Sequence, residues 1–195
     1  MRVCGLLGSR GDKVLGMSRP PHAKEKILAA YCALLCEDGE RAATMDATAA
    51  RAGVSKGGLL YHFKSKEALA EAVIVRFGEI AARDVAEMAA APEGPSRYYV
   101  QTSCQTDTEL DDYFRAVLRL AQGNNAVAVQ ALESVHRQWL DLIRMEVADP
   151  HAAEAIMLIG EGLYYQTTLP GSWSRGTFGE SLPQLLLQVD RLKAS

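Results

Sequence analysis

The sequence lacks any long apolar stretch. None of its apolar runs approaches the roughly 18 consecutive residues that a membrane-spanning helix needs. The short run at Val3–Leu7 is also too brief for the hydrophobic region of a signal peptide, and charged residues follow it closely. We therefore expect a cytoplasmic protein with no membrane partner.

The chain also lacks cysteines and histidines that are spaced as metal ligands. Its four cysteines show no Cys-x-x-Cys spacing, and its four histidines are scattered along the chain. Cys32 and Cys36 would lie one turn apart on a helix, where they either fill the core or form a redox pair. The sequence predicts no metal site and no cofactor.

Signatures of common enzymes are absent too. The sequence has no Gly-x-Ser-x-Gly turn, no phosphate-binding P-loop, no Gly-x-Gly-x-x-Gly after a strand and no His-Glu-x-x-His motif. Glu133, His136 and Asp141 lie near one another on a predicted helix, but no nucleophile or metal partner accompanies them. We therefore expect a protein without enzymatic activity.

Charge is distributed unevenly along the chain, although the net charge is only −3. Residues 1–66 contain 11 lysines and arginines against 6 acidic residues, whereas residues 67–195 contain 10 against 18. A basic N-terminal part on an acidic body suits a protein that binds a polyanion with one end.

Hydrophobic periodicity predicts an all-α fold, because the alternation typical of strands is nearly absent. A mobile loop is expected at 170–179, where glycines accumulate. The predicted helices cover about 23–37, 44–52, 55–62, 65–90, 97–104, 108–122, 126–147, 150–168 and 182–192. They suggest a three-helix helix-turn-helix domain at 22–66 followed by a helical domain at 67–195.

Residues 1–21 are expected to form a flexible N-terminal extension. Its basic residues Arg2, Arg10, Lys13 and Arg19 could add contacts to DNA phosphates. The alternative is that translation starts at Met17, and the sequence leaves both interpretations open.

The segment TMDATAARAGVSKGGLLYHFKSKEAL, at Thr44–Leu69, carries the main functional signal. Gly53 permits a sharp reversal between two short helices, Val54 can fill the gap between them, and Ser55 can cap the second helix. The segment closely resembles the DNA-binding signature of the tetracycline-repressor (TetR) family. Thr48 departs from that signature, because the family usually has a large aliphatic residue there.

The second short helix has the chemistry of a DNA-recognition helix. Lys56 suits a phosphate or a guanine edge. Gly57 and Gly58 each cost about 1 kcal/mol of helix propensity relative to alanine, but they remove bulk where a helix would enter a groove. The predicted contacts to double-stranded DNA, several of them implied by the family resemblance, are Thr44, Ser55, Lys56, Gly57, Gly58, Tyr61, His62 and Lys66.

The resemblance further implies that 22–66 is the DNA-binding domain and that 67–195 is an effector-binding and dimerisation domain. In it, the last two long helices would pair with their copies in a homodimer, as a four-helix bundle. Apolar stripes and small residues on these helices agree with this, although the same faces could instead pack inside one subunit. The predicted interface residues are Ile156, Ile159, Gly160, Leu163, Leu182, Leu185, Leu186 and Val189.

An effector pocket is expected among the helices between the long helix at 65–90 and the dimer bundle. Aromatic and aliphatic walls there suit a small hydrophobic or aromatic molecule. The candidate pocket residues are Phe77, Tyr98, Phe114, Leu118, Trp139 and Tyr165. The sequence thus predicts a ligand-responsive transcriptional repressor on a pseudo-palindromic operator, with an activator or a ligand-independent DNA-binding protein as the alternatives.

Overall fold

The computed structural model describes residues 22–169 and 171–194, so the predicted extension at 1–21 lies outside the described residues. Within the described ranges the regular structure consists of nine helices and includes no strand, which confirms the all-α class. The helices are α1 (His22–Glu37), α2 (Met45–Ala52), α3 (Lys56–His62), α4 (Lys66–Ala90), α5 (Pro95–Thr102), α6 (Glu109–Gln122), α7 (Ala126–Glu146), α8 (Pro150–Thr168) and α9 (Trp173–Lys193).

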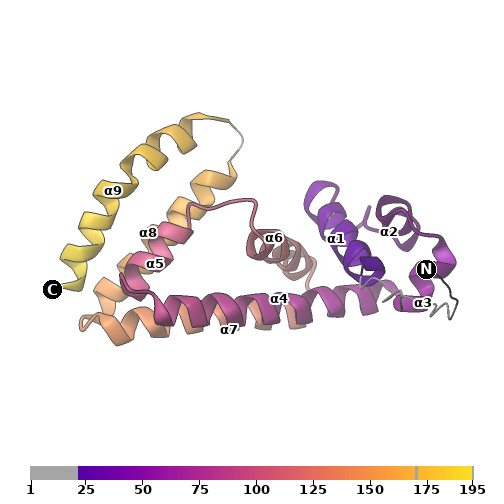
Figure 1. The fold of residues 1–195 in the computed structure, drawn as a ribbon, viewed down its shortest axis with the longest axis horizontal. Coiled ribbons are helices and arrows are strands. Elements are labelled where there is room, and N and C mark those ends of the chain that lie inside the picture. The colour runs from indigo at the N-terminus through magenta and orange to yellow at the C-terminus, as the bar shows by residue number, and fades with distance from the viewer. Residues whose placement is uncertain (1–21, 170, 195) are drawn as a thin grey trace, which may run out of the picture.

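The helices form an elongated arrangement, with α1, α2 and α3 at one end and α8 and α9 at the other (Figure 1). The 25-residue α4 leads from the first group along the molecule, and α7 packs against it. α6 contacts α1, α4 and α7. It therefore links the N-terminal group of helices to the rest of the molecule.

N-cap side chains explain where α2 and α4 begin. The hydroxyl of Thr44 accepts a hydrogen bond from the backbone N–H of Ala47, and that of Ser65 accepts one from Ala68. Each cap satisfies one of the backbone donors that have no partner at a helix start. The helices predicted at about 44–52 and 65–90 therefore begin where they were expected, as α2 and α4.

A single hydrophobic core connects the helices. α1 contributes a buried apolar stripe to it, in which Tyr31 and Leu35 have no exposed surface. Phe77 on α4 and Ile143 on α7 belong to the same core. No helix in the described part of the chain is both long and apolar enough to cross a membrane.

The prediction of a loop at 170–179 was wrong for most of that segment. α9 begins at Trp173 and includes Gly176 and Gly179. Glycine weakens a helix by about 1 kcal/mol but does not exclude it. Phe178 packs against the core and contacts the Trp173 ring edge-on at 6.0 Å between centroids, which favours the helix over the loop.

α5 also differs from its prediction, because it begins at Pro95 instead of near Arg97. Proline is favourable in a first helical turn, where its missing N–H would have no helical partner. Gly94 precedes it with φ 88°, a conformation that suits glycine.

Candidate DNA-binding surface and effector cavity

α2 and α3 form a helix-turn-helix. Gly53 ends α2 in the left-handed conformation, with φ 67°, and its N–H bonds to the carbonyls of Ala49 and Ala50. The Ser55 hydroxyl then accepts a hydrogen bond from Gly58 N–H at 3.0 Å and fixes the start of α3. Leu59 and Phe63 are buried and hold α3 against the other helices.

The opposite surface of α3 is open to solvent. Lys56, Gly57, Tyr61 and His62 are exposed, and 77% of the Tyr61 surface is accessible. The Tyr61 and His62 rings meet edge-on at 5.1 Å between centroids. A cation, a hydroxyl and an imidazole thus lie on one exposed helix, next to a glycine with no heavy atom within 4 Å of its missing Cβ.

Two predicted DNA contacts form ion pairs within the protein. Lys56 Nζ lies 2.9 Å from Asp46 Oδ1 on α2, and both side chains are exposed. Lys66 Nζ donates a hydrogen bond to the carbonyl of Glu40 at 2.5 Å and is more enclosed. The Lys56 pair is exposed and weak enough to exchange with a phosphate, whereas Lys66 joins the start of α4 to the loop after α1.

The remaining predicted contacts are Thr44, Ser55 and Gly58. The first two are exposed N-cap residues whose hydroxyls already accept a backbone hydrogen bond. Gly58 is partly buried, with Ser55 Oγ 3.2 Å from the position of its missing Cβ. Thr48, the departure from the family signature, is fully buried, and its hydroxyl donates to the Thr44 carbonyl at 2.7 Å.

A cavity of about 320 Å³ lies between α4, α5, α6, α7 and α8. Its size falls at the lower end of the range for small-molecule sites. Three residues predicted for the pocket line it, namely Tyr98, Phe114 and Trp139.

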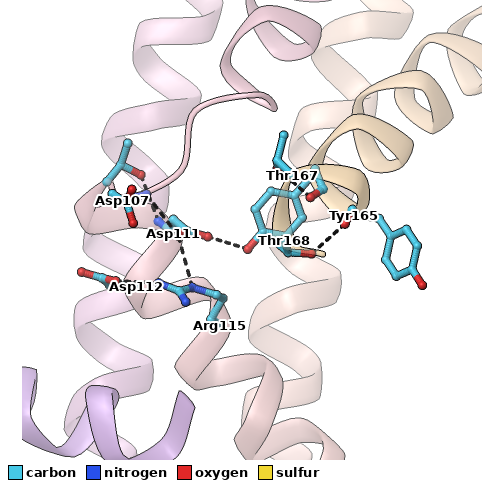
Figure 2. Close-up of polar contacts among 9 residues, drawn as sticks. Asp107, Asp111, Asp112, Arg115, Tyr165, Thr167 and Thr168 are labelled. Carbon is cyan, nitrogen blue, oxygen red and sulfur yellow. Dashed lines mark hydrogen bonds and ion pairs between the residues drawn. The ribbon is translucent and has the colours of Figure 1, made fainter. Parts of the chain in front are cut away.

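The structure corrects the prediction for the other three pocket residues. Phe77 is buried behind Phe114, with 6.1 Å between ring centroids. Leu118 lies on the outer surface of α6, because its neighbours Ala116 and Val117 occupy the buried face. Tyr165 is exposed, and its ring points away from α6 (Figure 2).

The sequence analysis missed the polar lining of the cavity. Asp84 lies on the apolar stripe of α4, between the buried Ile80 and Met88. Its carboxylate accepts hydrogen bonds from Trp139 Nε1 at 2.8 Å and from the Tyr98 hydroxyl at 3.2 Å. Burial raises the pKa of the Asp84 carboxyl, and these hydrogen bonds offset only part of that rise. An aspartate at a core position of the α4 pattern was the available signal.

Asp111 anchors α6 to α8 at one side of the cavity. It is 5% exposed and accepts a hydrogen bond from the Tyr164 hydroxyl at 2.6 Å. Arg115 forms an ion pair with it, and the Asp107 N–H donates to it (Figure 2). Burial and this hydrogen bond raise the pKa of the Tyr164 hydroxyl, so the phenol remains the proton donor.

His136 and Glu161 connect α7 to α8 on another side. His136 Nδ1 lies 2.7 Å from the Leu132 carbonyl, and its Nε2 lies 3.3 Å from Glu161 Oε1. Tyr99 donates a hydrogen bond to the same carboxylate oxygen at 2.8 Å. The hydrogen bond to Glu161 raises the pKa of His136. Burial alone would raise the pKa of the Glu161 carboxyl, but its hydrogen bonds to His136 and Tyr99 outweigh burial and lower that pKa.

Comparison with protein families identifies the chain. Residues 27–73 match a family described as bacterial regulatory proteins, tetR family, and residues 93–176 match a tetracyclin repressor-like C-terminal domain. Together these segments include more than half of the chain. It belongs to the TetR family. TetR-family proteins are transcriptional regulators rather than enzymes. No curated protein sequence matches the chain.

Solved structures share the TetR fold with this chain. GusR of Salmonella enterica has a TM-score of 0.60 and 22% identity, over 89% of this chain and 97% of GusR. The multidrug binding protein EbrR, solved with malachite green, has a TM-score of 0.59 and 22% identity, over 88% of this chain and 98% of EbrR. SmeT, solved with triclosan, has a TM-score of 0.52 and 19% identity, over 88% and 90%.

TetR-family regulators dimerise, but the predicted interface residues lie in the subunit's own core. Ile156, Gly160, Leu163, Leu186 and Val189 are buried, and Ile159, Leu182 and Leu185 pack partly buried against the same core. The prediction selected the most apolar stripe of each helix, and this stripe packs inside the subunit.

Other residues of α8 and α9 form the exposed apolar face. Leu158 is 69% exposed and Tyr165 is 60% exposed on α8, with Gly162 between them. On α9, Trp173 is 72% exposed and Leu187 is 49% exposed. We call these five residues the outer face.

Proposed function

We propose that this TetR-family regulator is a repressor that binds a pseudo-palindromic operator as a homodimer and leaves it when a small hydrophobic or aromatic effector binds. The observation that carries the proposal is the exposed surface of α3, where Lys56, Gly57, Tyr61 and His62 lie together on the second helix of a helix-turn-helix. In this motif the second helix enters the major groove.

The two parts of the chain would have separate functions. Residues 22–66 would bind DNA, and residues 67–195 would bind the effector and the second subunit. A dimer presents two α3 helices, which must lie about 34 Å apart to reach successive major-groove faces of one operator. The outer face of α8 and α9 supports this dimer, because its four large apolar side chains and Gly162 are exposed to water in the single subunit.

The cavity would receive the effector. Both EbrR and SmeT were solved with small molecules, malachite green and triclosan respectively. α6 lines the cavity with Leu110 and Phe114 and also packs against α1, and α4 lines it and leads directly to α3. An effector that fits better when α4 or α6 has shifted would change the spacing of the two α3 helices and so favour release, because only differential affinity moves such an equilibrium.

The test is binding of the purified protein to labelled duplex DNA from immediately upstream of its own gene, at several salt concentrations. Lys56→Ala/Tyr61→Ala should lose the specific complex, since both side chains are exposed on α3 and removal of neither opens the core. Met145→Arg on α7, at a residue 83% exposed, is the matched surface control and should bind like the wild type. The proposal would be overturned if no variant, the wild type included, bound the upstream fragment more tightly than random DNA and if none selected a preferred sequence from a random pool.

A further inference from the structure

The cavity contains more negative charge than its own cations neutralise. Its lining includes five carboxylates but only one arginine. Three of the carboxylates have cationic partners within the subunit: Glu109 pairs with Arg76 and Arg83, Asp111 with Arg115, and Glu161 with His136. Among the described residues, no lysine, arginine or histidine forms an ion pair with the remaining two, Asp84 and Glu87.

Asp84 is the carboxylate that a ligand would meet inside the cavity. Both of its oxygens are held in place, one by Trp139 Nε1 at 2.8 Å and the other by the Tyr98 hydroxyl at 3.2 Å. These donors are neutral, so they orient the carboxylate without cancelling its charge. Glu87 lies one turn further along α4, is exposed, and accepts from the same Tyr98 hydroxyl at 3.3 Å.

Aromatic rings surround this charge. Phe114 lies 6.4 Å from Trp139 and 5.5 Å from Tyr164 between ring centroids, and Tyr99 lies 5.6 Å from Trp139. The faces of such rings attract organic cations, most strongly where water is excluded. Among the described residues, no group of three or more His, Cys, Asp or Glu side chains is placed to hold a metal ion.

We infer that the effector of this cavity is an organic cation with an aromatic or alkyl body, whose positive nitrogen lies against Asp84 and whose apolar part contacts the surrounding rings. The inference rests on the proposed role of the cavity as the effector site. A neutral hydrophobic ligand would shield the partly buried Asp84 carboxylate from water without giving it a cationic partner, which carries a cost that a cation removes. The cavity would therefore select its effector by charge as well as by shape.

The test uses two probes of the same shape that differ only in charge, phenyltrimethylammonium and tert-butylbenzene. The sequence contains two tryptophans, Trp139 in the cavity wall and Trp173 on the outer face. In a Trp173→Phe background, the fluorescence of Trp139 alone reports occupancy of the cavity. The cation should bind about tenfold tighter than tert-butylbenzene, or better.

The variant Asp84→Asn removes the charge and retains a similar shape. It should lose most of this selectivity, with the affinity for the cation falling about tenfold and that for tert-butylbenzene changing little. Glu71→Gln makes the same charge change at an exposed position of α4 that does not line the cavity, and should keep the selectivity. Circular dichroism and thermal unfolding check that each variant is folded.

Equal or tighter binding of tert-butylbenzene by the folded wild type, or no binding of the cation at millimolar concentration, would overturn the inference. DNA binding by the same preparations separates this failure from failure of the proposed function. Loss of charge selectivity with specific DNA binding intact would overturn only the ligand class, whereas absence of specific DNA binding would overturn the regulator itself.

Discussion

Under the proposed function, Gly57 would serve DNA binding at the expense of stability. It lies in the first turn of α3, and a Cβ built there meets no heavy atom within 4 Å. Packing within the subunit therefore gives no reason for a glycine. The proposed approach of α3 to a DNA groove would give one, since a side chain at this exposed position would stand between helix and DNA.

Gly57→Ala should therefore stabilise the protein and weaken DNA binding. The expected gain in the free energy of unfolding is up to about 1 kcal/mol, from the higher helix propensity of alanine. Urea unfolding and titration of operator DNA measure the two effects. Gly78→Ala is the matched control, because Gly78 lies in the middle of α4 with equally open space around it. It should raise stability without lowering DNA affinity, and a Gly57→Ala protein that binds DNA like the wild type would contradict this role.

Asp84 makes a second prediction at the scale of single residues. Burial raises its pKa, so the folded protein holds the Asp84 proton more tightly than the unfolded chain does. Stability should fall as the pH rises through the window between the unfolded pKa, about 3.9, and the raised folded value. At neutral pH the ionised carboxylate lowers stability, so Asp84→Asn should unfold at a higher temperature than the wild type. A lower unfolding temperature for this variant at pH 7 would show that the ionised carboxylate stabilises the fold.

At the scale of the helix, α8 has two faces with different partners. Its inner face contacts α5 closely, because a Cβ at Gly160 would lie 2.5 Å from Tyr99 Cε1 and 2.9 Å from Ser103 Oγ. Its outer face carries Gly162, where a Cβ would meet nothing within 4 Å. Two glycines two residues apart thus have different roles.

Gly160→Ala should destabilise the subunit by about 1–3 kcal/mol, the usual cost of an extra group in a packed core. It should also disturb the cavity, since the Tyr99 ring that it displaces is part of the wall. Chemical unfolding and the Trp139 fluorescence of the Trp173→Phe background measure both effects. Stability equal to that of the wild type would mean that α5 and α8 are less closely packed than the structure indicates.

The sequence predicted most helices because their signals are local. Thr44, Ser55 and Ser65 each cap a helix through a hydrogen bond within three residues. The contents of the cavity and the partner of each helix face depend on distant segments, which no local pattern encodes. The apolar stripe of α8 marked a buried face correctly, but it did not specify burial by α5 rather than by a second subunit. The α4 pattern could have drawn attention to Asp84, but it could not identify its partner Trp139, which is 55 residues away.

At the scale of the whole molecule, α1, α2 and α3 lie at one end of an elongated subunit, and α8 and α9, which carry the outer face, lie at the other (Figure 1). A dimer through the outer face would place the two α3 helices far apart and leave both free to reach DNA. The cavity lies between these ends. Two of the helices that line it, α4 and α6, also pack against α1.

Leu158→Arg should convert the dimer to a monomer, because it introduces a charge into the outer face at its 69% exposed leucine. The monomer should remain helical and should bind operator DNA far more weakly, since it has only one α3. Light scattering gives the oligomeric state, and Met145→Arg, which adds the same charge on α7, should remain dimeric. A dimeric Leu158→Arg protein would place the subunit interface elsewhere.

Selection of binding sites from a random pool of duplex DNA tests the central claim most directly. The account predicts that the wild type enriches one pseudo-palindromic sequence, with half-sites about one helical turn apart or a multiple of it. It also predicts that Lys56→Ala/Tyr61→Ala enriches none. Enrichment of no sequence by the wild type, or of the same sequence by the double variant, would contradict the claim that α3 of this protein reads DNA.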